Sequence, residues 1–333
     1  MNKNKEIAKK VVDRIVATIE EGKPLPWVKP WGRSSHTVTV QDGVKTVVLQ
    51  PTAWNRRGKQ YRGANTYLPV GEYITYKQAS DEGYFPRKGS KGWPVVYWHF
   101  MKKTTTDPDT GEEKTETIPF LKYYTVFSVK DCIKIDDDGN AVAMTAKHHP
   151  APRVVEFPIT HEEHRENSGD LFGTAEDVIA DYVSRAGNWF YVKRDKDSDR
   201  AYYSPMGDYV VVPRREQFAK QSEYYSTLFH ELGHSTGHKT RLNRMTGKDK
   251  IAAWGDEAYS REELVAEATA ASVLNAIGME EANTFRNSAA YIKSWASHLQ
   301  ADPMMYVTAM TRAQAAFDLI VGVTEDETEE TGE

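Results

Sequence analysis

Residues 224–238 read YYSTLFHELGHSTGH, and this stretch decides the fold of the C-terminal half of the chain. It has helical character, and residues four apart on a helix lie one turn above each other. His230 and His234 can therefore bind one metal ion together through their imidazoles. Glu231 then lies beside the metal, where it can take a proton from a water that the metal activates. The stretch predicts one zinc ion per chain, with Glu231 as the catalytic base.

A zinc site of this kind needs a third protein ligand. One pattern places a third histidine six residues after the second, but Thr240 stands at that position and His238 comes two residues early. The other pattern takes a glutamate from a following helix, which residues 260–274, SREELVAEATAASVL, supply. We favour this second pattern, and we expect Glu262 within it not to bind metal.

Two glutamates of this second helix lie one turn apart on an alanine-rich face. Both Glu263 and Glu267 are expected to point toward the interior, where two carboxylates require a cation or hydrogen-bond donors. We assign Glu263 as the metal ligand and Glu267 as the acceptor that orients a ligand histidine. The reverse assignment stays open, as does the alternative that both carboxylates cap the helix or pair with Arg261 or Arg241.

The sequence also suggests how a peptide could meet the metal. Residues 208–213, DYVVVP, are predicted to form a strand at the edge of a small sheet, where an extended peptide can add. Tyr259, Arg241 and His238 are candidates for stabilising the oxyanion of the reaction.

The chain has 333 residues, with 43 Lys and Arg against 48 Asp and Glu. This length is sufficient for two domains of ordinary size, each with its own core. No apolar run approaches the roughly 20 residues that a membrane helix requires, so we expect no membrane partner. The single cysteine, Cys132, excludes an internal disulfide framework and fits a reducing compartment, so we expect a cytoplasmic protein.

Charge is unevenly divided along the chain. Residues 1–134 carry 23 basic and 14 acidic residues, a balance of +9, whereas the remaining residues balance to −14. The basic half suggests a polyanionic partner, and the acidic half suggests a separate unit with a different task.

The N-terminal half is predicted to be an antiparallel α+β domain. Apolar residues recur at helical spacing over residues 7–19, after which the period changes to two. Hairpins are expected over residues 36–49, around Asp42-Gly43, and over residues 93–129. A short helix is expected over residues 75–82.

Aromatic and basic residues alternate in this half, a combination typical of surfaces that bind single-stranded nucleic acid. Flat rings stack on exposed bases, and the cations contact phosphates. The predicted phosphate contacts are Arg56, Arg57, Lys59, Arg62, Arg87, Lys88 and Lys91. The predicted stacking residues are Trp54, Tyr61 and Trp93, whereas Trp27, Trp31, Tyr67 and Trp98 are expected in the core.

Composition shifts near residue 135, where prolines and polar clusters replace any sustained period. We predict domains over residues 1–135 and 173–322, a linker over residues 136–172 and an acidic disordered tail over residues 323–333. In the second domain, Thr174 is expected to cap a first helix. Further helices are predicted over residues 222–237, 260–277, 289–299 and 304–320.

Both halves resemble the ArdC-type antirestriction proteins. The second resembles their zincin-like peptidase domain, and the first is similar to their single-stranded-DNA-binding domain. The matching stretches of the second half are Tyr203-Ser204-Pro205, DYVVVP, Phe218, YYSTLFHELGHSTGH, RLNR, REELVAE and YIKSWASHL. Those of the first half are PWVKPW, Asn55, GKQYRGAN, Gln78, RKGSKG and VVYW.

The resemblance implies a plasmid- or phage-encoded protein that binds single-stranded DNA and shields incoming DNA from host restriction. By motif position it also implies that His230, His234 and Glu263 hold the metal. We expect zinc-dependent peptidase chemistry in the second domain, with a host protein as the candidate substrate. One alternative is a general intracellular zinc endopeptidase without a DNA role. The other is a DNA-protective binding protein with a catalytically silent zincin domain.

Overall fold

The chain folds into two compact units that interleave along the sequence. One contains residues 1–23, 53–149 and 293–307, and the other contains residues 24–52, 150–292 and 308–333. A computed structural model describes residues 3–21, 38–41, 44–49, 52–106, 113–159, 171–187, 189–245, 257–279 and 289–323. None of the helices in these ranges is both long enough and apolar enough to cross a membrane.

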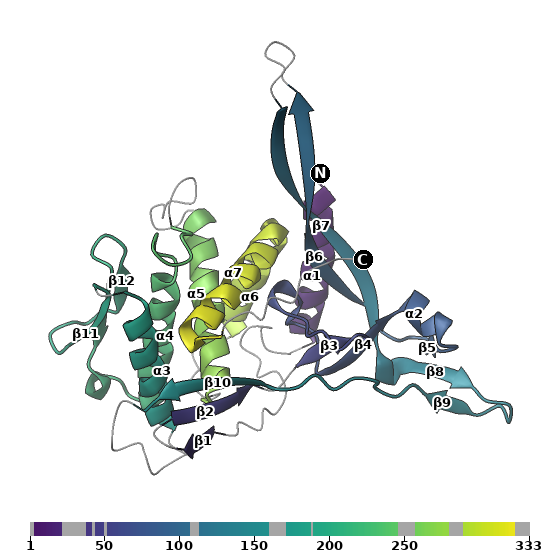
Figure 1. Cartoon of the computed structure of the whole chain (residues 1–333), viewed down its shortest axis with the longest axis horizontal. Helices are drawn as coiled ribbons and strands as arrows, with labels where there is room; N and C mark the ends of the chain where they lie inside the picture. The colour runs from purple at the N-terminus through teal and green to yellow at the C-terminus, as the bar shows by residue number, and fades with distance from the viewer. Residues whose placement is uncertain are drawn as a thin grey trace. The chain divides into compact units, whose positions relative to one another are not determined.

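The first unit is built around a four-stranded sheet of order β3-β4-β7-β6 and a three-stranded sheet of order β5-β8-β9 (Figure 1). Its helices are α1 (Lys3–Glu20) and α2 (Tyr76–Asp81). Its strands are β3 (Ala53–Asn55), β4 (Gly71–Thr75), β5 (Phe85–Pro86), β6 (Trp93–Thr106), β7 (Glu113–Ser128), β8 (Cys132–Ile135) and β9 (Ala141–Ala143).

Both helices of this unit form for local reasons. Helix α1 buries an apolar stripe that includes Ile7, Val11 and Ile15. Helix α2 begins with a capping box, in which Thr75 Oγ1 accepts from the Gln78 amide and Gln78 Oε1 accepts from the Thr75 amide. The expected helices over residues 7–19 and 75–82 are therefore confirmed.

Strands β6 and β7 form the long hairpin that the sequence predicts over residues 93–129. Strand β4 pairs with β7 only from Val126 to Ser128, so the outer part of the hairpin is a two-stranded ribbon. The Asn65 side chain covers part of the β6 edge, because its amide donates to the Val96 carbonyl and its oxygen accepts from the Val96 amide, both at 2.8 Å.

The second unit contains the sheets β1-β2-β10 and β11-β13-β12. Its strands are β1 (Val38–Gln41), β2 (Val44–Leu49), β10 (Arg153–Pro158), β11 (Tyr191–Asp195), β12 (Tyr202–Ser204) and β13 (Tyr209–Pro213). Its helices are α3 (Leu171–Arg185), α4 (Gln221–Ser235) and α5 (Glu257–Ala276), while α6 (Ala289–Ala301) and α7 (Pro303–Val321) contribute to both units. The core joins β10, β13, α3, α4 and α5 around buried residues such as Phe157, Tyr182 and Phe229.

Three expectations about this unit are wrong. Residues 208–213 are not an edge strand, because β13 lies between β11 and β12. Thr174 is not a helix cap, because α3 begins at Leu171 and Thr174 is fully buried. The stretch 136–172 is not all linker, because it includes β9 and β10, and β10 pairs with β2.

A buried ion pair connects the first hairpin to α3. Lys45 Nζ on β2 lies 2.8 Å from Asp177 Oδ2, and both side chains are fully buried. The hairpin over residues 36–49 is confirmed as a pairing of β1 with β2, but it belongs to the second compact unit. Trp27, Trp31 and most of the acidic tail lie outside the described residues.

Candidate functional site

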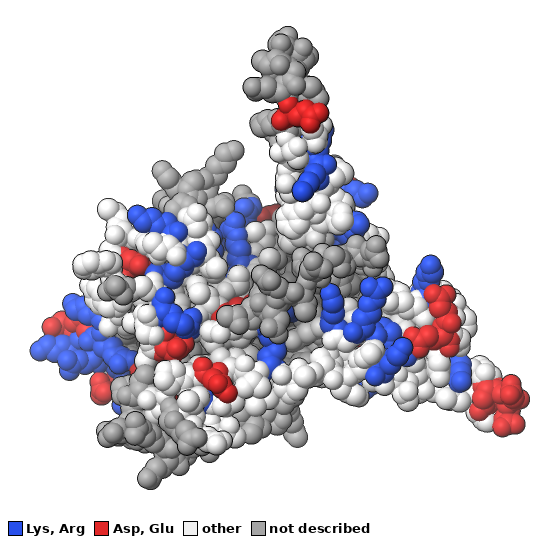
Figure 2. Space-filling view, in the orientation of Figure 1, with Lys and Arg blue, Asp and Glu red and all other residues white. Residues whose placement is uncertain are grey.

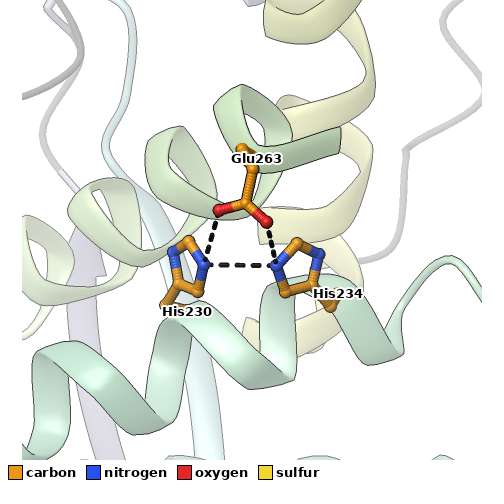
Figure 3. A group of neighbouring side chains, drawn as sticks. All are labelled: His230, His234 and Glu263. Carbon is orange, nitrogen blue, oxygen red and sulfur yellow. Dashed lines mark hydrogen bonds and ion pairs between the residues drawn. The ribbon is translucent and has the colours of Figure 1, made fainter. Parts of the chain in front are cut away.

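Two packed helices bring three potential metal ligands together. His230 and His234 lie one turn apart on α4, and Glu263 on α5 faces both rings (Figure 3). The two Nε2 atoms are 3.2 Å apart, and the Glu263 carboxylate oxygens lie 3.3 Å from His230 Nε2 and 3.4 Å from His234 Nε2. A search of the described ranges for three or more His, Cys, Asp or Glu side chains with converging donor atoms finds these three residues.

The three distances are close to the separations of ligand atoms around a divalent ion. Zinc bonds of about 2.0–2.1 Å to nitrogen and oxygen place neighbouring ligand atoms about 3.3–3.4 Å apart. The observed separations of 3.2, 3.3 and 3.4 Å are close to this value, with each histidine facing a different oxygen of the Glu263 carboxylate. The donor set of two imidazoles and one carboxylate is also one that zinc accepts. The predicted ligands therefore lie together in a geometry that suits the ion.

The glycine inside the motif sets the distance between the two helices. A Cβ at Gly233 would lie 3.0 Å from Ala266 Cα and 3.1 Å from the Ala266 carbonyl oxygen. Ala266 is one turn beyond Glu263 on α5, so this close approach holds the Glu263 carboxylate over the histidines. Backbone atoms on both sides leave little room for adjustment.

An arginine connects the same two helices beside the site. Arg244 donates to the Gly233 carbonyl at 2.5 Å and to Thr236 Oγ1 at 2.6 Å, both at the C-terminal end of α4. It also donates to both carboxylate oxygens of Glu262 on α5, at 2.8 to 3.2 Å. Glu262 in turn accepts from His234 Nδ1 at 3.3 Å.

A contact that the sequence did not predict joins Glu262 to the candidate ligand His234. Glu267, which the sequence assigned to orient a ligand histidine, is 4% exposed. The position of Arg244 was also missed. The adjacent pair Glu262-Glu263 was the signal that could have revealed the contact of Glu262. One of two adjacent carboxylates on a helix can face the metal position while the other faces a histidine.

Electrostatics favour ionised carboxylates around a charged histidine when the metal is absent. Burial alone would lower the pKa of His234, but its hydrogen bonds to Glu262 and Glu263 outweigh burial and raise it to about 10. Burial alone would raise the carboxyl pKa values, yet the same contacts lower the pKa of Glu263, and Arg244 helps to lower that of Glu262. A divalent cation would replace these protons.

The other candidates near the motif have different roles. Arg241 is occupied by an ion pair with Asp208 and donates to the Ser235 carbonyl at 2.8 Å, which contradicts a role in stabilising an oxyanion. His238 Nδ1 contacts Thr240 Oγ1 at 2.8 Å. The Tyr259 side chain lies outside the described residues. Glu231 is buried next to the candidate ligand His230 on α4.

Three predicted DNA contacts are wrong, because their side chains are buried or already paired. Trp54 and Tyr61 are 8% and 4% exposed, so their faces are not available to bases. Arg56 is held between Glu72 at 2.6 Å and Glu82 at 2.5 Å, so it is not available to a phosphate.

The other predicted DNA contacts differ in how exposed they are. Trp93 is half-buried beneath Arg14, whose guanidinium lies 4.1 Å from a ring centroid, and Lys91 pairs with Glu21 at 2.6 Å. Arg57, Lys59, Arg87 and Lys88 are exposed, and Arg62 is half-buried.

Two family matches follow the order of the predicted domains. Residues 5–127 match the N-terminal domain of anti-restriction factor ArdC, and residues 188–312 match a zincin-like metallopeptidase. The chain is 29% identical to a DNA primase TraC of Escherichia coli over 98% of its own length, but it spans only 28% of that primase.

Solved structures give the same result over nearly the whole chain. The metal-free antirestriction protein ArdC of plasmid R388 is 30% identical, with a TM-score of 0.52, over 96% of this chain and 97% of that one. Its Mn(II)-bound structure is 28% identical, with a TM-score of 0.53, over 94% and 96%. The α+β chain with its C-terminal zincin-like domain therefore belongs to the ArdC family of antirestriction proteins.

Proposed function

We propose that the chain binds one divalent metal ion, zinc, through His230, His234 and Glu263 and hydrolyses peptide bonds there. The observation that carries this proposal is the convergence of His230, His234 and Glu263, a donor set that zinc accepts, with separations of 3.2 to 3.4 Å between the two imidazole nitrogens and from each nitrogen to a carboxylate oxygen. The Mn(II)-bound structure of R388 ArdC supports a divalent metal in this family.

Each side chain of the site has a task in this chemistry. Zinc would polarise the scissile carbonyl and make a water acidic enough to attack it near neutral pH. Glu231 would accept the proton of that water and return it to the leaving amine. Glu262 would hold the Nδ1 proton of His234, which leaves Nε2 as the lone-pair donor.

We further propose that the N-terminal part binds single-stranded DNA and that the protein protects incoming DNA from restriction. The match to the ArdC N-terminal domain and the +9 balance of residues 1–134 support this role. A host protein would be the peptide substrate, so that one part of the chain is bound to DNA while the other cleaves.

The first prediction separates metal binding from catalysis. Glu231→Gln keeps the size of the side chain but cannot accept the proton, so it should retain about one zinc per chain and lose hydrolysis and protection. His230→Ala and Glu263→Ala should lose the metal as well, as measured by metal analysis of the purified protein. Protection is measured as transfer of unmodified DNA into a restricting host.

Two results would favour the alternatives. Full protection by Glu231→Gln would assign protection to DNA binding and leave the zincin-like domain catalytically silent. Hydrolysis without any affinity for single-stranded DNA would indicate a general endopeptidase. Stoichiometric zinc in both His230→Ala and Glu263→Ala would refute the ligand set.

A further inference from the structure

Exposed apolar side chains gather on the β6/β7 hairpin. Six of the exposed large apolar side chains in the described ranges lie there: Tyr97, Phe100, Met101, Ile118, Tyr123 and Tyr124. Contiguous exposed apolar surface on a soluble domain usually marks a binding site. The hairpin therefore presents a surface that neither the metal centre nor the predicted basic loops account for.

Four rings and a lysine share one face of this hairpin. In the antiparallel register Val95 pairs with Tyr124, Tyr97 with Lys122, and His99 with Phe120, and directly paired residues lie on the same side. We call Tyr97, Tyr124, His99, Phe120 and Lys122 the tyrosine face. The tyrosine face runs along the β6/β7 hairpin, which Figure 1 shows.

The rings of the tyrosine face are ordered by contacts with each other. Tyr97 and Tyr124 lie edge to face with centroids 6.0 Å apart, and His99 and Phe120 do so at 4.9 Å. Tyr97 and Tyr124 nevertheless remain 38% and 49% exposed. Their ring surfaces are therefore available to a flat ligand.

A buried tyrosine supports the face from below. Tyr61 is buried, packs edge to face against Tyr73 at 6.2 Å and interacts with Tyr97 on the face. A contact with this buried neighbour restricts the position of the Tyr97 ring. Tyr61 then contributes to a ligand surface through Tyr97 and does not itself stack on a base.

Positive charge accompanies the rings. Lys122 Nζ lies 6.0 Å from the Phe120 centroid, and Lys102 and Lys103 are exposed farther along β6. Figure 2 shows basic side chains along the hairpin and an acidic group nearer to its outer end. Exposed rings interleaved with cations are complementary to a strand whose bases are unstacked and whose phosphates are negative.

We infer that the tyrosine face is where the bases of single-stranded DNA stack, with Lys122 contacting a phosphate. This inference rests on the proposed DNA binding and gives it a location. It replaces the buried Trp54 and Tyr61 by Tyr97 and Tyr124. Duplex DNA is not the ligand, because its bases are already stacked on each other and present no faces to the tyrosines.

The test uses the full chain and a fluorescent oligothymidine, with affinity measured by anisotropy. Tyr97→Ala and Tyr124→Ala should each weaken binding about tenfold, a typical loss for one stacking contact. Tyr97→Phe should bind like the wild type, because it keeps the ring. The salt dependence should not change in these variants, since no cation is removed.

The matched control is a second exposed aromatic pair of the same unit. Tyr76 and Phe85 are 56% and 46% exposed with ring centroids 6.1 Å apart, but they lie outside the hairpin. Tyr76→Ala and Phe85→Ala should leave the affinity unchanged. Circular dichroism melting curves identify any variant that loses affinity only by unfolding.

The outcomes distinguish this inference from the function on which it rests. If the wild type binds the oligonucleotide and the Tyr97→Ala/Tyr124→Ala double variant binds equally well, the location is wrong and DNA binding stands. If the double variant instead changes only the oligomeric state, the tyrosine face binds a second copy of the chain, and the inference is overturned. If the wild type does not bind, the proposed function itself fails.

Discussion

Arg244 connects the two helices that carry the proposed metal ligands. Its side chain is 4% exposed, and its guanidinium contacts the Gly233 carbonyl on α4 and the Glu262 carboxylate on α5. Glu262 then fixes the ring of His234. Outer contacts of this kind typically change metal affinity 10- to 100-fold.

We therefore expect Glu262→Gln and Arg244→Lys each to weaken zinc binding by about tenfold or more. The amide is a weaker acceptor for the His234 proton, and lysine cannot reproduce the fork of hydrogen bonds. Competition with a chromogenic chelator measures the affinity. The sequence alone predicted only that Glu262 does not bind the metal, and it gave no role to Arg244.

Arg241→Lys is the matched control for this prediction. Its side chain is equally buried, at 4% exposed, but its contacts, which include Asp208, Ser235 and Ala186, do not reach α5 in the described part of the chain. It should lower the melting temperature without changing zinc affinity. Equal affinity in the wild type and both test variants would show that the Arg244 contacts stabilise the fold alone.

The Asp208–Arg241 pair predicts an acid-sensitive stability. Burial tends to raise the Asp208 pKa, but hydrogen bonds from Arg241 and Tyr203 lower it below its ordinary value. A group whose pKa is lowered on folding contributes stability that is fully present above its unfolded pKa, about 3.9. That contribution is lost as the pH falls from about 4 through the folded pKa.

Asp208→Asn isolates this charge. Asparagine also tolerates the left-handed backbone found at this position, where φ is 50°. We expect a loss of about 3 kcal/mol at pH 7, because Arg241 is left buried without its partner. In urea titrations the difference from the wild type should shrink below pH 4. A difference that stays constant down to pH 3 would contradict the assignment.

The sequence predicts the residues of the site only where they lie close together in the chain. His230, Glu231 and His234 lie within five residues on one helix, so their relative positions follow from helical geometry. Whether Glu262 or Glu267 approaches His234 depends on the rotation of α5, which tertiary packing decides. Lys45 was not predictable as a buried residue, because its partner Asp177 is far away in the sequence.

Helices α4 and α5 depend on Gly233 for their close crossing. Gly233→Ala raises the intrinsic helix propensity by about 1 kcal/mol. The new Cβ would nevertheless lie 3.0 Å from the Ala266 backbone, and overpacking of this kind costs about 1–3 kcal/mol. We expect no net gain in stability and a weaker zinc affinity, since separating the helices moves Glu263 away from the histidines.

Chelator competition and thermal melting together test this expectation. A variant that melts higher than the wild type and binds zinc equally well would show that the helices can separate without moving Glu263. Thr227→Ala, a half-buried position of the same helix, serves as the control for helix propensity.

The sequence pattern predicted most helices and strands, but not which strands lie next to each other in a sheet. The helices α4, α5, α6 and α7 match their predicted ranges within a few residues, because apolar period and caps are local signals. The central place of β13 was missed, since order within a sheet depends on β11, a short strand with few apolar residues. β10 was missed for a similar reason, as its six residues stand among prolines and polar clusters.

The two compact units do not follow a single cut in the chain. Residues 24–52 belong with the unit that holds the metal centre, and residues 293–307 belong with the unit that holds the hairpin. A fragment that ends at residue 134 would leave Lys45 without Asp177. DNA binding is therefore best measured on the full chain with single substitutions, and not on separated halves.

The basic turn at residues 87–90 provides the last prediction. It closes through a hydrogen bond from the Ser90 amide to the Arg87 carbonyl, with Gly89 in the left-handed region at a φ of 88°. Arg87 and Lys88 are exposed on it. If they contact phosphates, Lys88→Gln should make the negative slope of log affinity against log salt less steep by about 0.7, the value for one contact to a single strand.

Arg56→Gln is the contrasting variant, because the sequence alone predicted the same role for it. Arg56 is held by Glu72 and Glu82 and donates to the Thr145 carbonyl at 3.1 Å. Its replacement should keep the salt slope of the wild type and lower the free energy of unfolding by about 3 kcal/mol, since Glu72 loses its buried partner. Oligonucleotide titrations at several salt concentrations measure both variants. A smaller slope for Arg56→Gln with an unchanged one for Lys88→Gln would mean that Arg56 leaves its ion pairs to bind DNA.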